Sequence, residues 1–109
     1  MWYLVIMLAV LVLAAVLEVG GDAAIRHGLL RASPSWLVVG ALALVSYGFV
    51  VNANRLIDFG RLMGLYIVVF FVVSQVINAT AFGGRPSVSV LVGGALIVIG
   101  GVVIQLGAS

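Results

Sequence analysis

Apolar residues run along this chain in four long stretches that short polar segments separate. A bilayer core is crossed by about 20 residues of α-helix at 1.5 Å per residue. By this rule the stretches predict membrane-spanning helices at about 2–24, 35–51, 62–82 and 88–106. The connections are short, and short connections make consecutive helices antiparallel. The pattern therefore predicts an all-α membrane protein with four transmembrane helices in a single domain, 1–109, with both termini on one side of the membrane.

The composition excludes several classes of protein. Hydrophobic residues make up 65% of the chain and charged residues 7%, whereas a soluble domain carries roughly 25% charged residues. The net charge of +2 comes from too few and too scattered basic residues for a nucleic-acid-binding surface. The chain has no cysteine and one histidine, and it shows no nucleotide-binding glycine loop and no nucleophile with a base. We therefore expect no nucleic-acid partner, no metal, no cofactor and no enzymatic activity.

The arginines lie near the ends of the predicted spans and leave the orientation in the membrane open. Arg26, Arg31 and Arg85 fall on one side, and Arg55 and Arg61 fall on the other. Three arginines on one side against two on the other give only a weak preference for one orientation under the positive-inside rule. The chain either inserts in one orientation or has dual topology, which would let two copies pair antiparallel.

Glu18 is the most informative polar residue, because it lies inside the first predicted span. An ionisable side chain at this depth costs about 2.5 kcal/mol or more unless it faces a cavity or a partner. A carboxyl binds either a proton or a cation. If the two compete for it, movement of a cation in one direction is coupled to movement of a proton in the other. The alternative is a structural role, with protonated Glu18 hydrogen-bonded to a neighbouring helix. Asp22 and Arg26 follow on the same helix face, so Asp22 either pairs with Arg26 or titrates together with Glu18.

Two further spans carry side chains suited to a site with Glu18. Tyr66 lies on the third span, and Tyr47 with its neighbour Ser46 lies on the second. Aromatic faces attract organic cations, although packing between helices explains each aromatic residue equally well. We predict a proton- and substrate-binding set of Glu18, Asp22, Tyr66, Tyr47 and Ser46.

Glycines on the fourth span predict a close helix contact. Gly93 and Gly94 are followed seven residues later by Gly100 and Gly101, and small residues at this spacing lie on one helix face where backbones can approach. Four short helices build a poor substrate site by themselves, because such sites lie between facing helices. We therefore expect a homodimer with these four glycines at the dimer contact. Packing within one chain is the alternative.

Several short motifs resemble the small multidrug resistance family, whose members are four-helix, proton-coupled exporters that work as antiparallel homodimers. The segment 17–22, LEVGGD, is similar to the family's glutamate followed three residues on by glycine. The segment 82–85, FGGR, resembles its Phe-Gly-x-Arg turn, and Gly93, the pair 96–97 and Gly100 match the spacing of its fourth-helix dimerisation motif. The resemblance covers essentially the whole chain.

This resemblance implies that Glu18 is the shared proton and substrate carboxylate, one from each subunit, and that Gly93 and Gly100 make the dimer contact. It also implies a multi-pass protein of the bacterial inner membrane. The third span departs from the family pattern. When the third span is aligned to the family pattern without gaps, Tyr66 takes the position of the family's tryptophan and Met63 that of its tyrosine. This difference argues against export of large aromatic cations.

Three hypotheses for the function stay open. The leading one is a proton-coupled antiporter that exports a small organic cation across the inner membrane, with Glu18 shared by proton and substrate. The second keeps the fold and changes the cargo, as a lipid-linked-sugar flippase-type subunit. The third is a small structural or assembly subunit of a larger membrane complex. The partners expected under the leading hypothesis are membrane lipid, protons, a small cationic substrate and a second copy of the chain.

Overall fold

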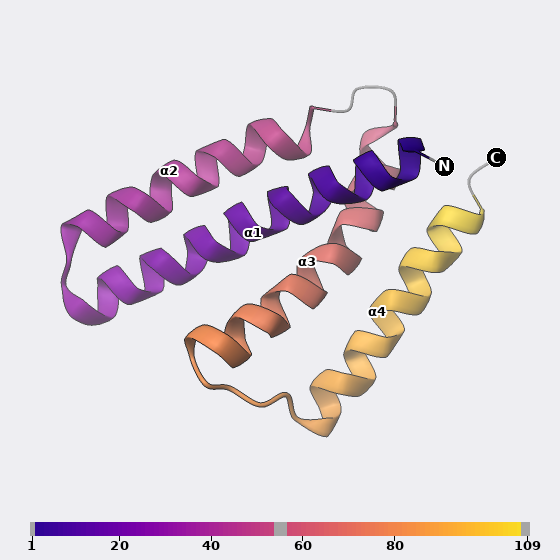
Figure 1. Cartoon of the computed structure of the whole chain (residues 1–109). Coiled ribbons are helices and arrows are strands. Elements are labelled where there is room, and N and C mark those ends of the chain that lie inside the picture. Colours follow the sequence, from indigo (N-terminus) through magenta and orange to yellow (C-terminus); the bar gives the residue numbers. More distant parts are fainter. Residues whose placement is uncertain (1, 54–56, 108–109) are drawn as a thin grey trace. The chain divides into compact units, whose positions relative to one another are not determined.

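The computed structural model describes residues 2–53 and 57–107, and within these ranges it forms four helices (Figure 1). Helix α1 spans Trp2–Arg31, α2 Pro34–Val51, α3 Phe59–Ala81 and α4 Val88–Leu106. Each helix is long and apolar enough to cross a membrane. The prediction of an all-α membrane protein with four transmembrane helices is therefore confirmed.

The chain divides into two compact units, and each is a hairpin of two helices. The first unit, Met1–Asn54, contains α1 and α2, and the second, Arg55–Ser109, contains α3 and α4. Within each unit the two helices pack against one another in opposite directions (Figure 1). Each hairpin therefore has its own helix contact.

Helix α1 is longer than the span predicted from bilayer thickness. It continues seven residues past the predicted end at 24 and stops at Arg31. The residues in between contain no proline, and a helix has no physical reason to end where the hydrocarbon ends. It ends where Ala32 adopts a left-handed conformation with φ of 51°. Pro34 then begins α2, in the first-turn position that suits proline.

Helix α3 begins three residues before the predicted start at 62, because a side chain caps it. The Asp58 carboxylate accepts a hydrogen bond from the backbone N–H of Arg61 at 3.0 Å. This satisfies a donor that the first turn of a helix leaves without a partner. Ser87 does the same for α4 by accepting from the N–H of Val90 at 3.2 Å.

Helices α1 and α2 approach closely where glycines face the neighbouring helix. A Cβ atom added to Gly40 would lie 2.7 Å from the carbonyl oxygen of Gly21 and 2.5 Å from Cγ1 of Ile25. A Cβ atom added to Gly28 would lie 2.8 Å from Cδ2 of Leu37. None of these distances leaves room for a side chain, so the glycines set how close the helices come.

The contact between α3 and α4 also depends on glycines. A side chain on Gly94 would overlap the ring of Phe71, and one on Gly101 would overlap Val68. At the end of the hairpin where α3 begins, Arg61 donates a hydrogen bond from Nη2 to Oε1 of Gln105 at 3.3 Å. Two of the four glycines predicted at a dimer contact therefore lie inside this hairpin.

Candidate functional site

Glu18 lies close to the middle of the membrane-crossing part of α1. Tyr3 and Arg26 are side chains of the kinds that mark the two membrane interfaces. They are 23 residues apart on this helix, which is about 35 Å at 1.5 Å per residue. Glu18 then lies about 5 Å from the midpoint between them by the same rise. This position corresponds to hydrocarbon depth when α1 crosses a bilayer, and the Glu18 side chain is partly buried.

The short α1–α2 turn determines which residue of α2 lies opposite Glu18. The contacts of the three glycines pair Gly28 with Leu37, Ile25 with Gly40 and Gly21 with Leu44. The residue numbers of each pair add to 65, so the register is constant along the hairpin. Continuing it by one helical turn pairs residue 18 with residue 47.

Tyr47 is the predicted site residue that the structure brings to Glu18. Its side chain is partly buried, and the Glu18 carboxylate lies near enough to act on its hydroxyl electrostatically. A phenol can donate a hydrogen bond to a carboxylate, and its ring face can attract a cation. The pair therefore combines a proton-binding group with an aromatic surface.

The other two polar residues of the predicted set in this hairpin are arranged differently. Ser46 is exposed, and its hydroxyl donates a hydrogen bond to the backbone carbonyl of Leu42 at 2.8 Å, within its own helix. Asp22 is exposed one turn after Glu18. Whether Asp22 pairs with Arg26 or titrates with Glu18 stays a prediction.

Tyr66 belongs to the second unit. It lies on α3 with 4% of its surface exposed, and its ring contacts that of Phe70 with 6.1 Å between the centroids. Its deep burial agrees with an inward-facing role. Its participation in a site with Glu18 stays a prediction.

The four glycines of α4 divide into two pairs with different surroundings. Gly94 and Gly101 contact α3, which is the packing within one chain that the sequence left open as the alternative. Added Cβ atoms on Gly93 and Gly100 would meet no atom within 4 Å. Gly93 and Gly100 therefore do not lie in the contact with α3, and a dimer contact there stays a prediction.

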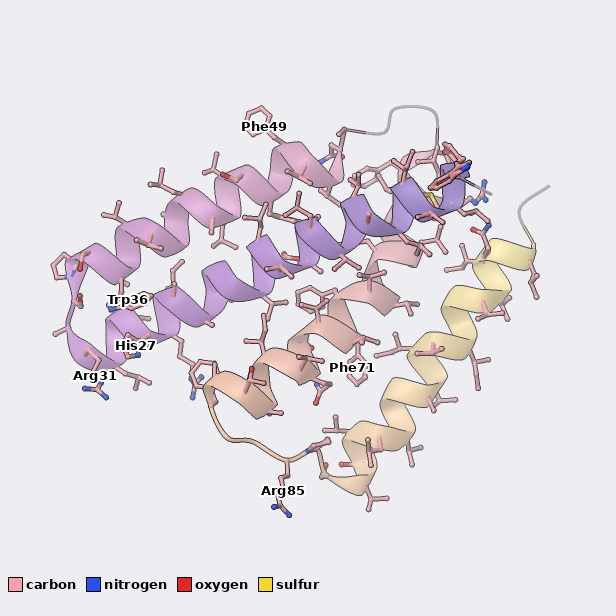
Figure 2. The ribbon with its side chains drawn as sticks, in the orientation of Figure 1. His27, Arg31, Trp36, Phe49, Phe71 and Arg85 are labelled. Atoms are coloured by element: carbon pink, nitrogen blue, oxygen red, sulfur yellow. The ribbon has the colours of Figure 1, made fainter. Side chains whose placement is uncertain are left out.

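A contact at the α1–α2 turn was missed by the sequence reasoning. His27 and Trp36 meet edge to face, with 4.9 Å between ring centroids and 76° between ring planes (Figure 2). The two residues come from different helices, and only the position of the turn brings them together. No group of three or more potential metal ligands gathers anywhere in 2–53 or 57–107.

Sequence comparison finds relatives along most of the chain. A UPF0060 membrane protein of Mycolicibacterium gilvum is 41% identical over 96 residues, covering 86% of this chain and 88% of the relative. Another, from Frankia casuarinae, is 33% identical over 99 residues and covers 90% of both chains. A third, from Clavibacter sepedonicus, is 32% identical over 94 residues. The chain belongs to the UPF0060 membrane protein family. It is a multi-pass membrane protein of a family found in bacteria, which confirms the predicted localisation.

The assignment to the small multidrug resistance family is wrong. The relatives that match most of the chain are UPF0060 membrane proteins, no protein-family model matches the chain, and no solved structure matches it. The motifs behind the assignment are a few glycines, a Phe-Gly turn and a Leu-Ile pair in an apolar background. Such residues recur in transmembrane hairpins for packing reasons alone.

Proposed function

We propose that this UPF0060 protein is a proton-coupled antiporter that exports a small organic cation, with Glu18 binding proton and substrate in turn. The observation that supports this proposal is the partly buried Glu18 carboxyl, near the middle of the apolar part of α1, beside Tyr47.

The cost of a bare charge in hydrocarbon supplies the coupling. An unpaired carboxylate at this depth is disfavoured by about 2.5 kcal/mol or more, which corresponds to roughly a 70-fold lower population. Protonated Glu18 is neutral, and a complex of ionised Glu18 with a monovalent cation is neutral as well. Both states can therefore change their access from one side of the membrane to the other, whereas the empty ionised state rarely does. Exchange of a proton for a cation follows.

Tyr47 gives the site a preference for organic cations over water. Its ring face can attract an ammonium or guanidinium group by cation–π interaction, worth about 0.5–2 kcal/mol. Its hydroxyl can donate a hydrogen bond to the ionised carboxylate in the cation complex. A small cation suits the site because Glu18 and Tyr47 lie on adjacent helices of one tight hairpin.

A homodimer is part of the proposal, with a second copy on the face of α4 that carries Gly93 and Gly100. Small residues there would let two α4 helices approach without moving the α3–α4 contact, because nothing lies within 4 Å of either added Cβ atom. With dual topology the two copies would run antiparallel.

The test is proton release from purified protein in detergent on addition of guanidinium, quaternary ammonium and polyamine compounds. We expect release from the native protein and none from Glu18→Gln. Asp58→Asn is the matched control, because it also removes one carboxyl while asparagine keeps the helix cap. Release that survives Glu18→Gln would refute the mechanism. No release from folded native dimer would favour the flippase or structural hypothesis.

A further inference from the structure

The basic residues of the first unit that the structure describes lie at one end of it. Arg26, His27 and Arg31 occupy the last turns of α1, and both arginines are exposed. Helix α2, which packs against this end, carries no Asp, Glu, Lys or Arg from Pro34 to Val51. Asp22, one turn before Arg26, is the nearest acid in the α1 sequence. The α1–α2 turn is therefore a locally positive surface.

An exposed tryptophan completes this surface. Trp36 is 46% exposed at the start of α2 and contacts His27 across the turn. Figure 2 shows Arg31 directed away from the ribbon at the same end of the hairpin. Tryptophan prefers the headgroup level of a bilayer, and arginine matches the geometry of a phosphate with two parallel hydrogen bonds. Together these side chains have the composition of a lipid headgroup site.

We propose that Arg26, His27, Arg31 and Trp36, the basic rim, bind the phosphate of an anionic phospholipid. Charge complementarity points to this occupant: cationic side chains at the surface of a membrane protein meet the headgroups of its own bilayer. Each arginine near an anionic membrane surface strengthens binding about fivefold. The rim would hold α1 at a set depth, with Glu18 two helical turns below Arg26. This proposal does not depend on the transport activity.

The chain has two tryptophans, and they allow the rim to be measured against the opposite end of α1. Trp2→Phe leaves Trp36, on α2, as the sole tryptophan at the rim, and Trp36→Phe leaves Trp2 at the opposite end of α1. Each variant is reconstituted in phosphatidylcholine vesicles with increasing fractions of brominated phosphatidylglycerol or brominated phosphatidylcholine. Quenching of fluorescence by bromine reports which lipid lies beside each tryptophan.

We expect brominated phosphatidylglycerol to be preferred at Trp36 by about fivefold or more, the effect of at least one arginine. The double substitution Arg26→Gln and Arg31→Gln should abolish that preference and leave the quenching of Trp2 unchanged. Circular dichroism of the double variant confirms that it is folded. Because the contact is electrostatic, high salt should also lower the preference at Trp36.

Two results would overturn the proposal. An unchanged preference at Trp36 in the folded double variant would mean that the arginines do not hold the lipid. Loss of the preference on adding inorganic phosphate, but not on adding sodium chloride at the same ionic strength, would mean that the rim recognises a free anion and not a headgroup.

Discussion

The close approach of α1 and α2 predicts that Gly40 tolerates no side chain, not even a methyl group. In Gly40→Ala the new Cβ atom would lie 2.5 Å from Cγ1 of Ile25 and 2.7 Å from the carbonyl oxygen of Gly21. The Ile25 side chain can rotate, but the backbone oxygen can move only with its helix. Restoring an ordinary separation of 3.4 Å from that oxygen requires the two helices to separate by about 0.7 Å.

The expected loss follows from a matched pair of substitutions on α2. Gly48 has no atom within 4 Å of an added Cβ atom, so Gly48→Ala changes only the helix propensity, by up to about 1 kcal/mol in favour of folding. That term is common to both variants and cancels in their difference. The difference is then the steric cost at Gly40, for which overpacking gives about 1–3 kcal/mol. Because the new Cβ atom meets a backbone oxygen, we expect the steric cost to lie in the upper half of this range, at about 2–3 kcal/mol.

Equilibrium unfolding of the two variants in mixed micelles, driven by increasing sodium dodecyl sulfate and followed by tryptophan fluorescence, measures this difference. We expect Gly40→Ala to unfold at a clearly lower detergent fraction than the native protein, and Gly48→Ala to unfold at the same fraction or a higher one. Equal midpoints for the two alanine variants would show that α1 and α2 do not meet at Gly21 and Gly40. The register that pairs Glu18 with Tyr47 would then lose its support.

Four further substitutions test separate parts of the structure. Asp58→Ala should destabilise the protein by about 0.5–2 kcal/mol in the same unfolding assay, because it removes the acceptor for the Arg61 N–H. Tyr47→Phe should leave the protein folded and raise the substrate concentration for half-maximal proton release about tenfold, the effect of losing one hydrogen bond to a charged group. Gly100→Leu should abolish the homodimer in size-exclusion chromatography with no loss of stability, whereas Gly101→Leu should unfold the α3–α4 hairpin, because Gly101 faces Val68.

The number and type of helices could be predicted from the sequence because apolar length is a strong signal. A bilayer requires about 20 apolar residues per helix, and the chain repeats that length four times. Glu18 could be singled out for the same reason, since a carboxyl inside such a stretch needs an explanation. Both inferences depend on composition along the chain and not on the ends of helices.

The partner of Glu18 could not be predicted, because it depends on where the turn lies. Predicted spans ending at 24 and beginning at 35 imply a turn of ten residues, whereas the structure has only Ala32 and Ser33 between α1 and α2. Shifting the centre of the turn changes every pairing across the hairpin. The long turn would have placed a residue near 41 opposite Glu18, not Tyr47.

The roles of the α4 glycines could not be separated by sequence either. Gly93 and Gly94 differ by one position, which is a rotation of about 100° on a helix. The structure assigns Gly94 to the contact with Phe71 and leaves Gly93 open. A pattern of small residues shows that a close contact exists, but the neighbour in that contact is determined by the fold.

The packing on either side of Glu18 limits how a substrate can reach it. One turn toward the α1–α2 turn, Gly21 faces Leu44 with 3.0 Å between an added Cβ atom and Cγ of Leu44. One turn the other way, the same register pairs Ala14 with Val51, whose exposed fractions are 0% and 2%. The interface between α1 and α2 is therefore tightly packed one helical turn before Glu18 and one helical turn after it. A cation that reaches Glu18 must approach from the side of the hairpin and not along the line between its helices, so the access path is formed by whatever covers that side in the membrane.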